Sequence, residues 1–402
     1  MIKKLNILFV AWDSPDVKYL EGLFVPIFHH WSLQWGHSIH ILHFSWSDSA
    51  RQHFLTEFCK GRGINYTPVQ VSQRPVAAIG KFFTTLKGTS ILKRYIQENK
   101  IDVVMPRSTM PARMLLPLLS RSRSFKVLFD ADGLPIEERV DFAGLKPRSY
   151  RYKSLKAIEK GIITAADAVL TRTEKAAVYL SEQYHVPLSK FNVVRNGSDR
   201  HTFKFSPELR QTRRKELGVP PEALLLVYSG SLGPQYGVEQ MFLINKRLRA
   251  RDIDSRLLIL TNHPHFLSTY AINPEDQIFV RSVEFSEIPG YLSSGDLGFA
   301  IRKDTHSMQG VAPIKVGEYL LNGLPIVASA RIGDSRNLLA GQPFIHLLED
   351  YSEHSLNEAI QWIEESVVGS NFPREQPTAF GSSLFSIEVS AETYQNAIVS
   401  LS

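Results

Sequence analysis

Short apolar runs alternate with longer amphipathic segments over most of the chain. In the first half the apolar runs are residues 5–11, 39–43, 103–105, 127–129, 169–170 and 193–194. In the second half they are residues 224–229, 257–260, 278–280, 297–301, 326–328 and 344–347. Buried parallel strands form continuous apolar runs, and helices of period 3.6 connect them. The pattern therefore predicts an α/β fold with two doubly wound parallel sheets.

A polar stretch separates the two halves. We expect an N-terminal domain at residues 1–204, a linker at 205–221 and a C-terminal domain at 222–375. Residues 371–383 are rich in Pro, Ser and Gly, and residues 376–402 are expected to form a C-terminal helix that packs back on the first domain. Ligands bind at the carboxyl ends of parallel strands, so two such sheets facing each other predict a cleft.

Composition narrows the class of protein. The 402 residues include 43% hydrophobic residues and carry a formal net charge of +6, which favours acidic partners without choosing among nucleotides, anionic lipid and nucleic acid. No apolar run is long enough to cross a bilayer, and residues 1–10 do not resemble a signal peptide. We therefore expect a cytoplasmic protein or one on the inner face of the cytoplasmic membrane. The single cysteine, Cys59, excludes an internal disulfide framework.

The segment 309–329 carries the clearest sign of a binding site. Pro313 suits the first turn of a helix. Gly323 followed by Pro325 ends that helix before the apolar run at 326–328. A loop therefore leads into a helix N-terminus, where free N–H groups and the helix dipole favour an anion.

Two charged side chains on this helix sharpen the prediction. The ammonium of Lys315 adds positive charge where a nucleotide diphosphate would lie. Glu318 is one turn further along, where a carboxylate would repel phosphate but could accept hydrogen bonds from two ribose hydroxyls. The simpler interpretation is an ordinary amphipathic helix with a glycine stop.

The histidines show no metal-binding pattern. They lack cysteine or carboxylate partners at ligand spacing, so we expect core or surface histidines and no metal site. Those considered are His29, His30, His37, His40, His43, His263 and His265.

Four segments in the right order complete a family pattern. They are residues 166–174 with 194–203, residues 228–239, residues 287–298 and residues 313–328. The first contains Asn196-Gly197-Ser198-Asp199, and the second contains the turn Gly230-Ser231-Leu232-Gly233. Each segment is weak alone, but together they resemble the retaining glycosyltransferases of the GT-B fold, family 4, over nearly the whole chain.

This resemblance implies two Rossmann-like domains facing across a cleft. The N-terminal domain would bind a glycan or lipid-linked acceptor, and the C-terminal domain a UDP- or GDP-sugar. The implied reaction transfers the sugar with retention in cell-surface polysaccharide or glycolipid synthesis, with no metal, no other cofactor and no nucleic acid. Front-face attack within an ion pair is expected, since no carboxylate is clearly placed as a covalent nucleophile.

The resemblance also implies the donor site. The expected nucleotide- and phosphate-binding residues are Gly22, Gly230, Ser231, Leu232, Gly233, Tyr236, Arg281, Val283, Lys303, Gln309, Gly310, Val311, Ala312, Pro313, Ile314 and Glu318.

This chain departs from its relatives in the donor site. Ser231 and Tyr236 stand where relatives carry an arginine and a lysine that neutralise the leaving diphosphate. We expect Arg302 and Lys315 to replace that charge as catalytic residues, with help from Lys303. Gly310 stands where relatives place a glutamate on the donor sugar, so the identity of that sugar stays open.

In the first half, residues 129–140 resemble the acceptor side of the family's site. Asp132 is the expected catalytic residue that orients the acceptor hydroxyl or takes its proton, and the expected acceptor-binding residues are Arg107, Asp130 and Glu138. Alternatively, Asp130 caps a turn, Asp132 is merely exposed and Arg107 is a surface residue. The pair Asp130 and Asp132 also mimics the metal-binding pair of the other glycosyltransferase fold, which would leave the second nucleotide-like half unexplained.

Residues 146–160 predict a basic amphipathic helix. Arg148, Arg151, Lys153 and Lys156 alternate with apolar side chains, so this helix either meets an anionic membrane surface or is a solvated helix that covers the sheet. Two other classes of function stay open for the chain as a whole. One is a UDP-sugar 2-epimerase, and the other is a catalytically inert partner subunit.

Overall fold

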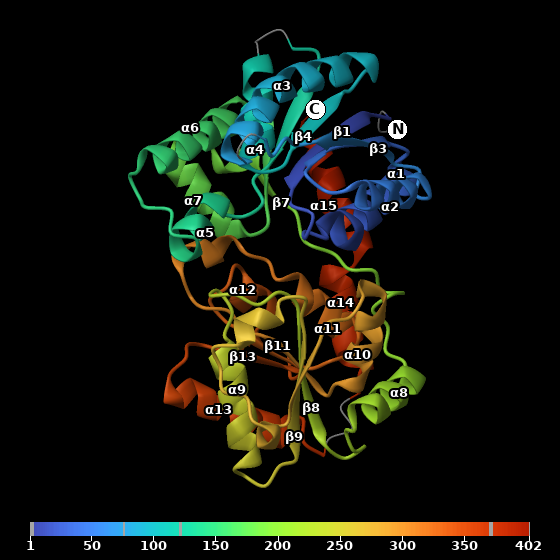
Figure 1. The fold of residues 1–402 in the computed structure, drawn as a ribbon, viewed down its shortest axis with the longest axis vertical. Coiled ribbons are helices and arrows are strands. Elements are labelled where there is room, and N and C mark those ends of the chain that lie inside the picture. The colour runs from blue at the N-terminus through green and yellow to red at the C-terminus, as the bar shows by residue number, and fades with distance from the viewer. Residues whose placement is uncertain (1–3, 75–76, 120–122, 370–372, 402) are drawn as a thin grey trace. The chain divides into compact units, whose positions relative to one another are not determined.

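The computed structural model describes residues 4–74, 77–119, 123–369 and 373–401 (Figure 1). The chain divides into two compact units. Unit 1 consists of Met1–Arg195 and Ile387–Ser402, and unit 2 of Asn196–Ser386. The boundary after Arg195 lies about ten residues before the one expected from the sequence.

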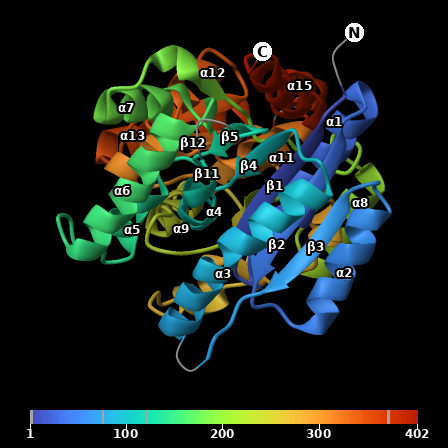
Figure 2. The same cartoon turned by 90° about the horizontal axis from the view of Figure 1, so that it is seen from above.

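Unit 1 is built on a parallel sheet (Figure 2). Its described strands are β1 (Asn6–Asp13), β2 (Ser38–Ser45), β3 (Asn65–Gln70), β4 (Val103–Pro106), β5 (Lys126–Asp130), β6 (Ala168–Thr171) and β7 (Phe191–Val193). Their order in the sheet is β3-β2-β1-β4-β5-β6-β7. The sequence pattern missed β3, because an edge strand with polar, half-exposed positions and Pro68 lacks a continuous apolar run.

Helices cover both faces of this sheet. They are α1 (Val25–Trp35), α2 (Ser49–Lys60), α3 (Ala77–Glu98), α4 (Thr109–Leu115), α5 (Pro135–Phe142), α6 (Tyr150–Ala165), α7 (Glu174–Tyr184) and α15 (Ile387–Val399). Successive strand residues point to opposite faces. Phe9 packs on Phe24 and Phe28, while Leu8 and Val10 belong to the core cluster beneath α3, α4 and α6.

The helix α15 joins unit 1 from far along the sequence. The ring of Tyr394 contacts Phe28 and Trp31 of α1, with both centroid distances 5.5 Å. Trp31 Nε1 also donates a hydrogen bond of 2.8 Å to Gln395 Oε1. Figure 1 shows α15 in red beside the blue α1. These contacts therefore hold α15, the last helix of the described chain, against unit 1.

Unit 2 repeats the architecture with a second parallel sheet. Its described strands are β8 (Leu224–Ser229), β9 (Ser255–Leu260), β10 (Ile278–Arg281), β11 (Leu297–Ala300), β12 (Ile326–Ser329) and β13 (Ile345–Leu348), in the order β10-β9-β8-β11-β12-β13. Its helices are α8 (Pro207–Leu217), α9 (Val238–Arg249), α10 (Ile288–Ser294), α11 (Ile314–Leu321), α12 (Ser335–Leu339), α13 (Glu353–Ser366) and α14 (Glu375–Phe385). Leu225 and Val227 face the cluster with α10 and α11, and Leu226 and Tyr228 face α9 and α13.

One segment expected to be a linker is helical, and the expected C-terminal helix is two helices. The stretch 205–221 contains α8, because Ser206 accepts a hydrogen bond from the Leu209 N–H and Gly218 ends the helix in the left-handed region. The helix α8 packs on α10, so this stretch belongs to unit 2. Residues 376–402, expected as one helix on the first domain, instead form most of α14, which belongs to unit 2, and α15, which belongs to unit 1. Residues 371–372 of the Pro/Ser/Gly-rich stretch lie outside the described residues. None of the described helices has both the length and the apolar character that a membrane span needs.

A close approach of α14 to α11 yields a test of the fold. A Cβ on Gly381 would lie 2.9 Å from Leu320 Cβ and 3.0 Å from the backbone N of Leu321. The backbone of α11 cannot move away without disturbing its own packing. Gly381→Ala should therefore lower the free energy of unfolding of unit 2 by about 1–3 kcal/mol. Urea unfolding followed by circular dichroism measures this loss. Gly61→Ala, whose nearest neighbour would lie at 3.4 Å, is the matched control, and equal midpoints for the two variants would contradict the packing.

Candidate functional site

In unit 2, functional groups gather where the neighbouring strands β8 and β11 end and the helix α11 begins. Gly230 directly follows β8, and Arg302 lies two residues beyond β11. The helix α11 leads into β12, the next strand in the sheet. The carboxyl ends of adjacent parallel strands share one edge, so these segments meet there.

The N-terminus of α11 is held by a side chain from another loop. The helix begins at Ile314, with Pro313 as its N-cap, one residue later than the sequence suggested. Asn196 Nδ2 donates a hydrogen bond of 2.7 Å to the carbonyl oxygen of Ala312. This contact fixes the loop that aims the first N–H groups of the helix, which have no intrahelical acceptor. Asn196 lies in the family-like Asn-Gly-Ser-Asp segment, but its role in the loop was not predicted.

Lys315 is a buried cation among aromatic rings. Its side chain is 8% exposed, and Nζ lies 3.9 Å from the ring centroid of Tyr228 and 4.8 Å from that of Tyr236. Burial lowers the pKa of Lys315 well below its usual range, and nearby Arg302 lowers it further while Glu318 opposes the shift. A bound anion would therefore restore stability to the charged form.

Arg302 completes a pair of cations at this edge. Its guanidinium lies 4.6 Å from the ring centroid of Tyr236, and Nη2 is 3.4 Å from the Tyr236 hydroxyl oxygen. Its backbone N–H donates a 2.9 Å hydrogen bond to Ser329 Oγ, while its Nε is buried without a hydrogen-bond partner among the described residues. Within the described parts of the chain, neither Arg302 nor Lys315 forms an ion pair with a carboxylate.

The glycine turn after β8 makes room for Lys315. Gly230 has φ of +141°, and a Cβ on it would lie 3.0 Å from Lys315 Nζ. The Tyr228 hydroxyl donates a 2.5 Å hydrogen bond to the Ser231 carbonyl oxygen and so holds the turn. The sequence pattern predicted only that Tyr228 lies in a strand. Its contact with Lys315 depends on tertiary packing and left no separate sequence signal.

Glu318 lies one turn beyond Lys315, as the sequence predicted for a helical spacing. Its side chain is partly buried, and burial raises its pKa to about 7, against the opposing effect of Lys315. No hydrogen bond or ion pair joins its carboxylate to another described residue. It therefore remains available to accept hydrogen bonds from a ligand.

The other expected donor residues occupy varied positions. Leu232 and Gly310 are buried, Gly233 accepts the Tyr236 N–H within the turn, and Val311 donates to the Met308 carbonyl. Gln309 contacts His306 through a 3.0 Å hydrogen bond. The remaining three are Lys303 and Arg281, which are exposed, and Val283, which packs on the unit 2 core.

Gly22, one of the residues expected to bind phosphate, lies in a helical turn and not in an open loop. It is part of a π-helical turn, Leu20–Phe24, that continues into α1, and its N–H donates to the Lys18 carbonyl. The apolar residues Leu20, Leu23 and Phe24 anchor this turn in the core of unit 1. A backbone N–H already used in this way cannot also bind phosphate, so the expectation for Gly22 is corrected.

In unit 1, charged side chains also gather at the strand ends. Arg107, which follows β4, is 7% exposed and pairs with Asp132 Oδ2 at 2.6 Å and Asp13 Oδ1 at 3.3 Å. Burial alone lowers the pKa of Arg107, but Asp132, Asp13 and Asp130 outweigh it and raise the pKa above its usual range. The alternative that Arg107 is a plain surface residue is therefore wrong.

Asp130 and Asp132 have different roles. Asp130 is fully buried, pairs with Arg172 Nη2 at 2.5 Å and accepts the Asp132 N–H at 3.1 Å. Burial raises the pKa of Asp130, while Arg172 opposes that rise. Asp132 adopts φ of +55°, and its side chain is 29% exposed. Asp130 thus caps the turn, as one alternative held, but Asp132 is ion-paired and only partly exposed. Asp13 and Arg172 were missed because their contacts join distant parts of the chain: Asp13 lies outside the family-like segments, and Arg172 lies within one that gave no sign of its pairing with Asp130.

Burial separates the charged residues of α5 and α6 into an interior group and an exposed group. Glu138 is partly exposed in the first turn of α5, whereas the adjacent Glu137 is buried and pairs with Lys156 at 2.9 Å. Lys156 also pairs with the buried Glu159. Lys156 therefore faces the interior of unit 1 and does not belong to the exposed basic face of α6. Arg148, Arg151 and Lys153 do lie exposed, beside Tyr150, which is 89% exposed.

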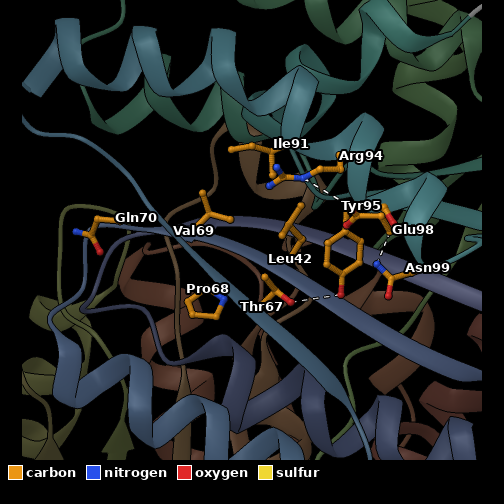
Figure 3. Close-up of a pocket in the computed structure, with 10 residues that line it drawn as sticks. All are labelled: Leu42, Thr67, Pro68, Val69, Gln70, Ile91, Arg94, Tyr95, Glu98 and Asn99. Carbon is orange, nitrogen blue, oxygen red and sulfur yellow. Dashed lines mark hydrogen bonds and ion pairs between the residues drawn. The ribbon is translucent and has the colours of Figure 1, made fainter.

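A cavity of about 460 Å³ lies between the edge strand β3 and α3 (Figure 3). Its polar groups bind one another. The Tyr95 hydroxyl is 3.4 Å from Thr67 Oγ1 and 3.2 Å from His40 Nδ1, and Asn99 donates to the Tyr95 carbonyl. No contact in this cavity points to a particular ligand.

Among the described residues, no cluster of three or more histidine, cysteine, aspartate or glutamate side chains could hold a metal ion. The two carboxylates that resembled a metal-binding pair, Asp130 and Asp132, are instead paired with different arginines.

Comparisons with known proteins bear on the fold. No family model matches the chain. A D-inositol 3-phosphate glycosyltransferase from a Nocardioides species is 29% identical over 103 residues, which cover 25% of this chain and only 22% of that protein.

Solved structures match along nearly the whole chain. A glycosyltransferase from Rickettsia africae has a TM-score of 0.74 at 14% identity and covers 100% of this chain and 99% of its own. Anabaena HepE with UDP and glucose has a TM-score of 0.71 at 13% identity and covers 98% and 100%. A UDP-N-acetylglucosamine 2-epimerase from Listeria monocytogenes has a TM-score of 0.55 at 12% identity and covers 99% and 96%. The chain therefore has the two-domain α/β fold of the GT-B glycosyltransferases, as its sequence pattern predicted.

The raised pKa of Glu318 predicts a pH dependence of stability. Its pKa is about 7 in the folded protein against an ordinary value of 4.5, so the folded state binds the proton more tightly. Unfolding stability should therefore fall as pH rises from about 4.5 through about 7. Glu318→Gln cannot ionise and should gain about 1–2 kcal/mol over wild type between these limits, given the partial exposure of the side chain. Urea unfolding at several pH values measures the difference.

The exposed Glu222 provides the control for this measurement. Glu222→Gln should follow wild type at every pH. A constant offset between Glu318→Gln and wild type across the range would show that Glu318 has an ordinary pKa.

Proposed function

We propose that this protein is a glycosyltransferase that moves a sugar from a nucleotide-diphosphate sugar to a hydroxyl of a glycan or lipid-linked acceptor. The observation that carries the proposal is the pair of cations, Lys315 and Arg302, beside the N-terminus of α11. Both lie against tyrosine rings and neither is paired with a carboxylate in the described part of the chain. Such a pair needs an anion, and a diphosphate carries the charge to satisfy both.

The pair would act on the leaving group. Cleavage of a sugar–phosphate bond builds negative charge on the diphosphate, and preorganised cations and helix N–H groups stabilise that charge more than the ground state. Lys315, with its lowered pKa, binds its proton firmly once the diphosphate is near. Glu318, at the next turn, would accept hydrogen bonds from the ribose hydroxyls.

The proposed acceptor side lies in unit 1. Asp132 is the member of its charged cluster with the greatest exposure, so it can accept a hydrogen bond from an acceptor hydroxyl. Retention through an ion pair, metal independence and a role in cell-surface polysaccharide or glycolipid synthesis extend the family resemblance. The UDP and glucose in the HepE structure support a UDP-sugar as donor.

An epimerase and an inert module remain outcomes of the test. Purified protein is incubated with UDP- and GDP-sugars, with and without glycan acceptors, and the products are separated. Sugar transfer or slow donor hydrolysis supports a transferase. Formation of the 2-epimer would identify an epimerase, and nucleotide-sugar binding without turnover would identify an inert module.

The phosphate role of Lys315 predicts a large catalytic effect. Lys315→Met keeps the chain length but removes the charge, so transfer should slow by about 100-fold or more. Addition of EDTA should leave the wild-type rate unchanged. Lys246→Met, on the exposed face of α9, is the control and should retain the wild-type rate. Strict dependence on Mg²⁺ or Mn²⁺ together with a fully active Lys315→Met would contradict this mechanism.

The exposed cations of α6 and of the turn before it predict that this face binds an anionic membrane, where a lipid-linked acceptor would lie. Arg148, Arg151 and Lys153 flank the exposed ring of Tyr150, and each cation adds about 1 kcal/mol of attraction to an anionic surface. Changing these three residues to Glu should abolish co-sedimentation of the protein with vesicles that contain about 30% phosphatidylserine. Transfer to a soluble acceptor should be unaffected.

A variant with the same charge change in unit 2 controls for net charge. Lys204, Lys215 and Lys246 are exposed, and changing them together to Glu should leave vesicle binding in place. Equal vesicle binding by both triple variants would remove the membrane face from the proposal.

A further inference from the structure

We infer that Tyr394, on the last helix of the described chain, is a positioning residue for Asp132. The two residues are 262 positions apart in the sequence. A line of buried contacts joins them inside unit 1, through Arg172 and Asp130. The functional half of this inference rests on the proposed role of Asp132 toward the acceptor, whereas its structural half does not.

The first contact fixes Arg172. Tyr394 is 1% exposed, and its ring is wedged against Phe28 and Trp31. Its hydroxyl oxygen accepts a hydrogen bond of 3.3 Å from Arg172 Nη1. That same nitrogen also donates to the Val194 carbonyl at 3.4 Å. The Nη1 group of Arg172 is therefore held both by α15 and by the residue that follows β7.

The next two contacts carry this constraint to the Asp132 backbone. Arg172 Nη2 donates to Asp130 Oδ2 at 2.5 Å, which leaves Asp130 Oδ1 to accept the Asp132 N–H at 3.1 Å. Asp132 has φ of +55°, a left-handed conformation that aspartate tolerates better than most L residues and that a local hydrogen bond stabilises. The carboxylate of Asp130 supplies that support, and Arg172 sets its orientation.

Asp132 is the member of this group of charged side chains that is most exposed to solvent. The side chains of Arg172, Asp130, Arg107 and Asp13 are 5%, 0%, 7% and 11% exposed, whereas that of Asp132 is 29% exposed. Among these five described side chains, three carboxylates face two guanidinium groups, which leaves one excess negative charge when all are ionised. His43 Nε2 lies 3.9 Å from Asp13 Oδ2, but burial lowers the pKa of His43 to about 4, so it adds no charge at neutral pH. A neutral hydrogen-bond donor such as a sugar hydroxyl suits this exposed position, and an anionic group does not. The placement of Asp132 thus decides how an acceptor hydroxyl is held.

A double-mutant cycle tests the functional half. Tyr394→Phe keeps the ring and removes the hydroxyl, so it should raise the acceptor KM and lower kcat/KM by about tenfold, with the donor KM unchanged. In the Asp132→Asn background the same change should lower kcat/KM by less than about twofold, because both variants act on one group. Additive effects would overturn the functional half.

Amide NMR tests the structural half without any substrate. Tyr394→Phe should shift the backbone amide signals of Asp132 and Gly133 in a ¹H–¹⁵N TROSY spectrum. Gln395→Met is the matched control, because it breaks the buried bonds from Trp31 and His37 to the same helix without touching Arg172. It should lower stability but leave those two amides in place.

The two experiments separate the possible failures. Unmoved amides in Tyr394→Phe would overturn the inference whatever the kinetics. Moved amides with unchanged acceptor kinetics in both Tyr394→Phe and Asp132→Asn would keep the positioning but refute the proposed role of Asp132. Equal amide shifts in Tyr394→Phe and Gln395→Met would show only a general loosening of α15, which also overturns the inference.

Discussion

The burial of Lys315, which forms no ion pair with a carboxylate among the described residues, is the constraint on which the unit 2 site depends. Removing an ammonium from water costs several kcal/mol, and cation–π contacts with Tyr228 and Tyr236 return only about 2 kcal/mol each at best. Glu318 gives partial compensation, but its own pKa is raised. The proposed diphosphate would supply the negative charge that this site lacks among the described residues. The Lys315 ammonium is enclosed by Gly230 and Tyr228, next to the fixed N-terminus of α11.

Unit 1 meets a related demand differently. Its cluster alternates arginines with aspartates, so nearly every buried charge has a partner within the same unit. The excess of one carboxylate falls at Asp132, where side-chain exposure is greatest. One unit thus presents unpaired cations and the other a partly exposed carboxylate. This division suits a reaction in which one substrate leaves as an anion and the other attacks through a hydroxyl.

The sequence predicted the features that follow from local patterns, and it missed the contacts between residues far apart in the chain. Buried parallel strands have continuous apolar runs, so both sheets were predicted, while the half-exposed β3 was not. The helix at Lys315 and the spacing to Glu318 follow from local rules for helix ends. The contacts of Tyr228 with Lys315, Asn196 with Ala312 and Tyr394 with Arg172 bring together distant positions that no local pattern links. The predictions for Gly22 and Lys156 were wrong for different reasons. The Gly22 N–H is used within a helical turn, and Lys156 pairs with the buried Glu137 and Glu159.

A structure of the protein with UDP bound would test the central claim most directly. The account predicts a β-phosphate oxygen within hydrogen-bond distance of Lys315 Nζ and of the first backbone N–H groups of α11, with the ribose hydroxyls on Glu318. It also predicts that Arg302 contacts the same diphosphate. A nucleotide bound elsewhere in unit 2, with Lys315 still enclosed by the two tyrosine rings and no phosphate beside it, would contradict the account.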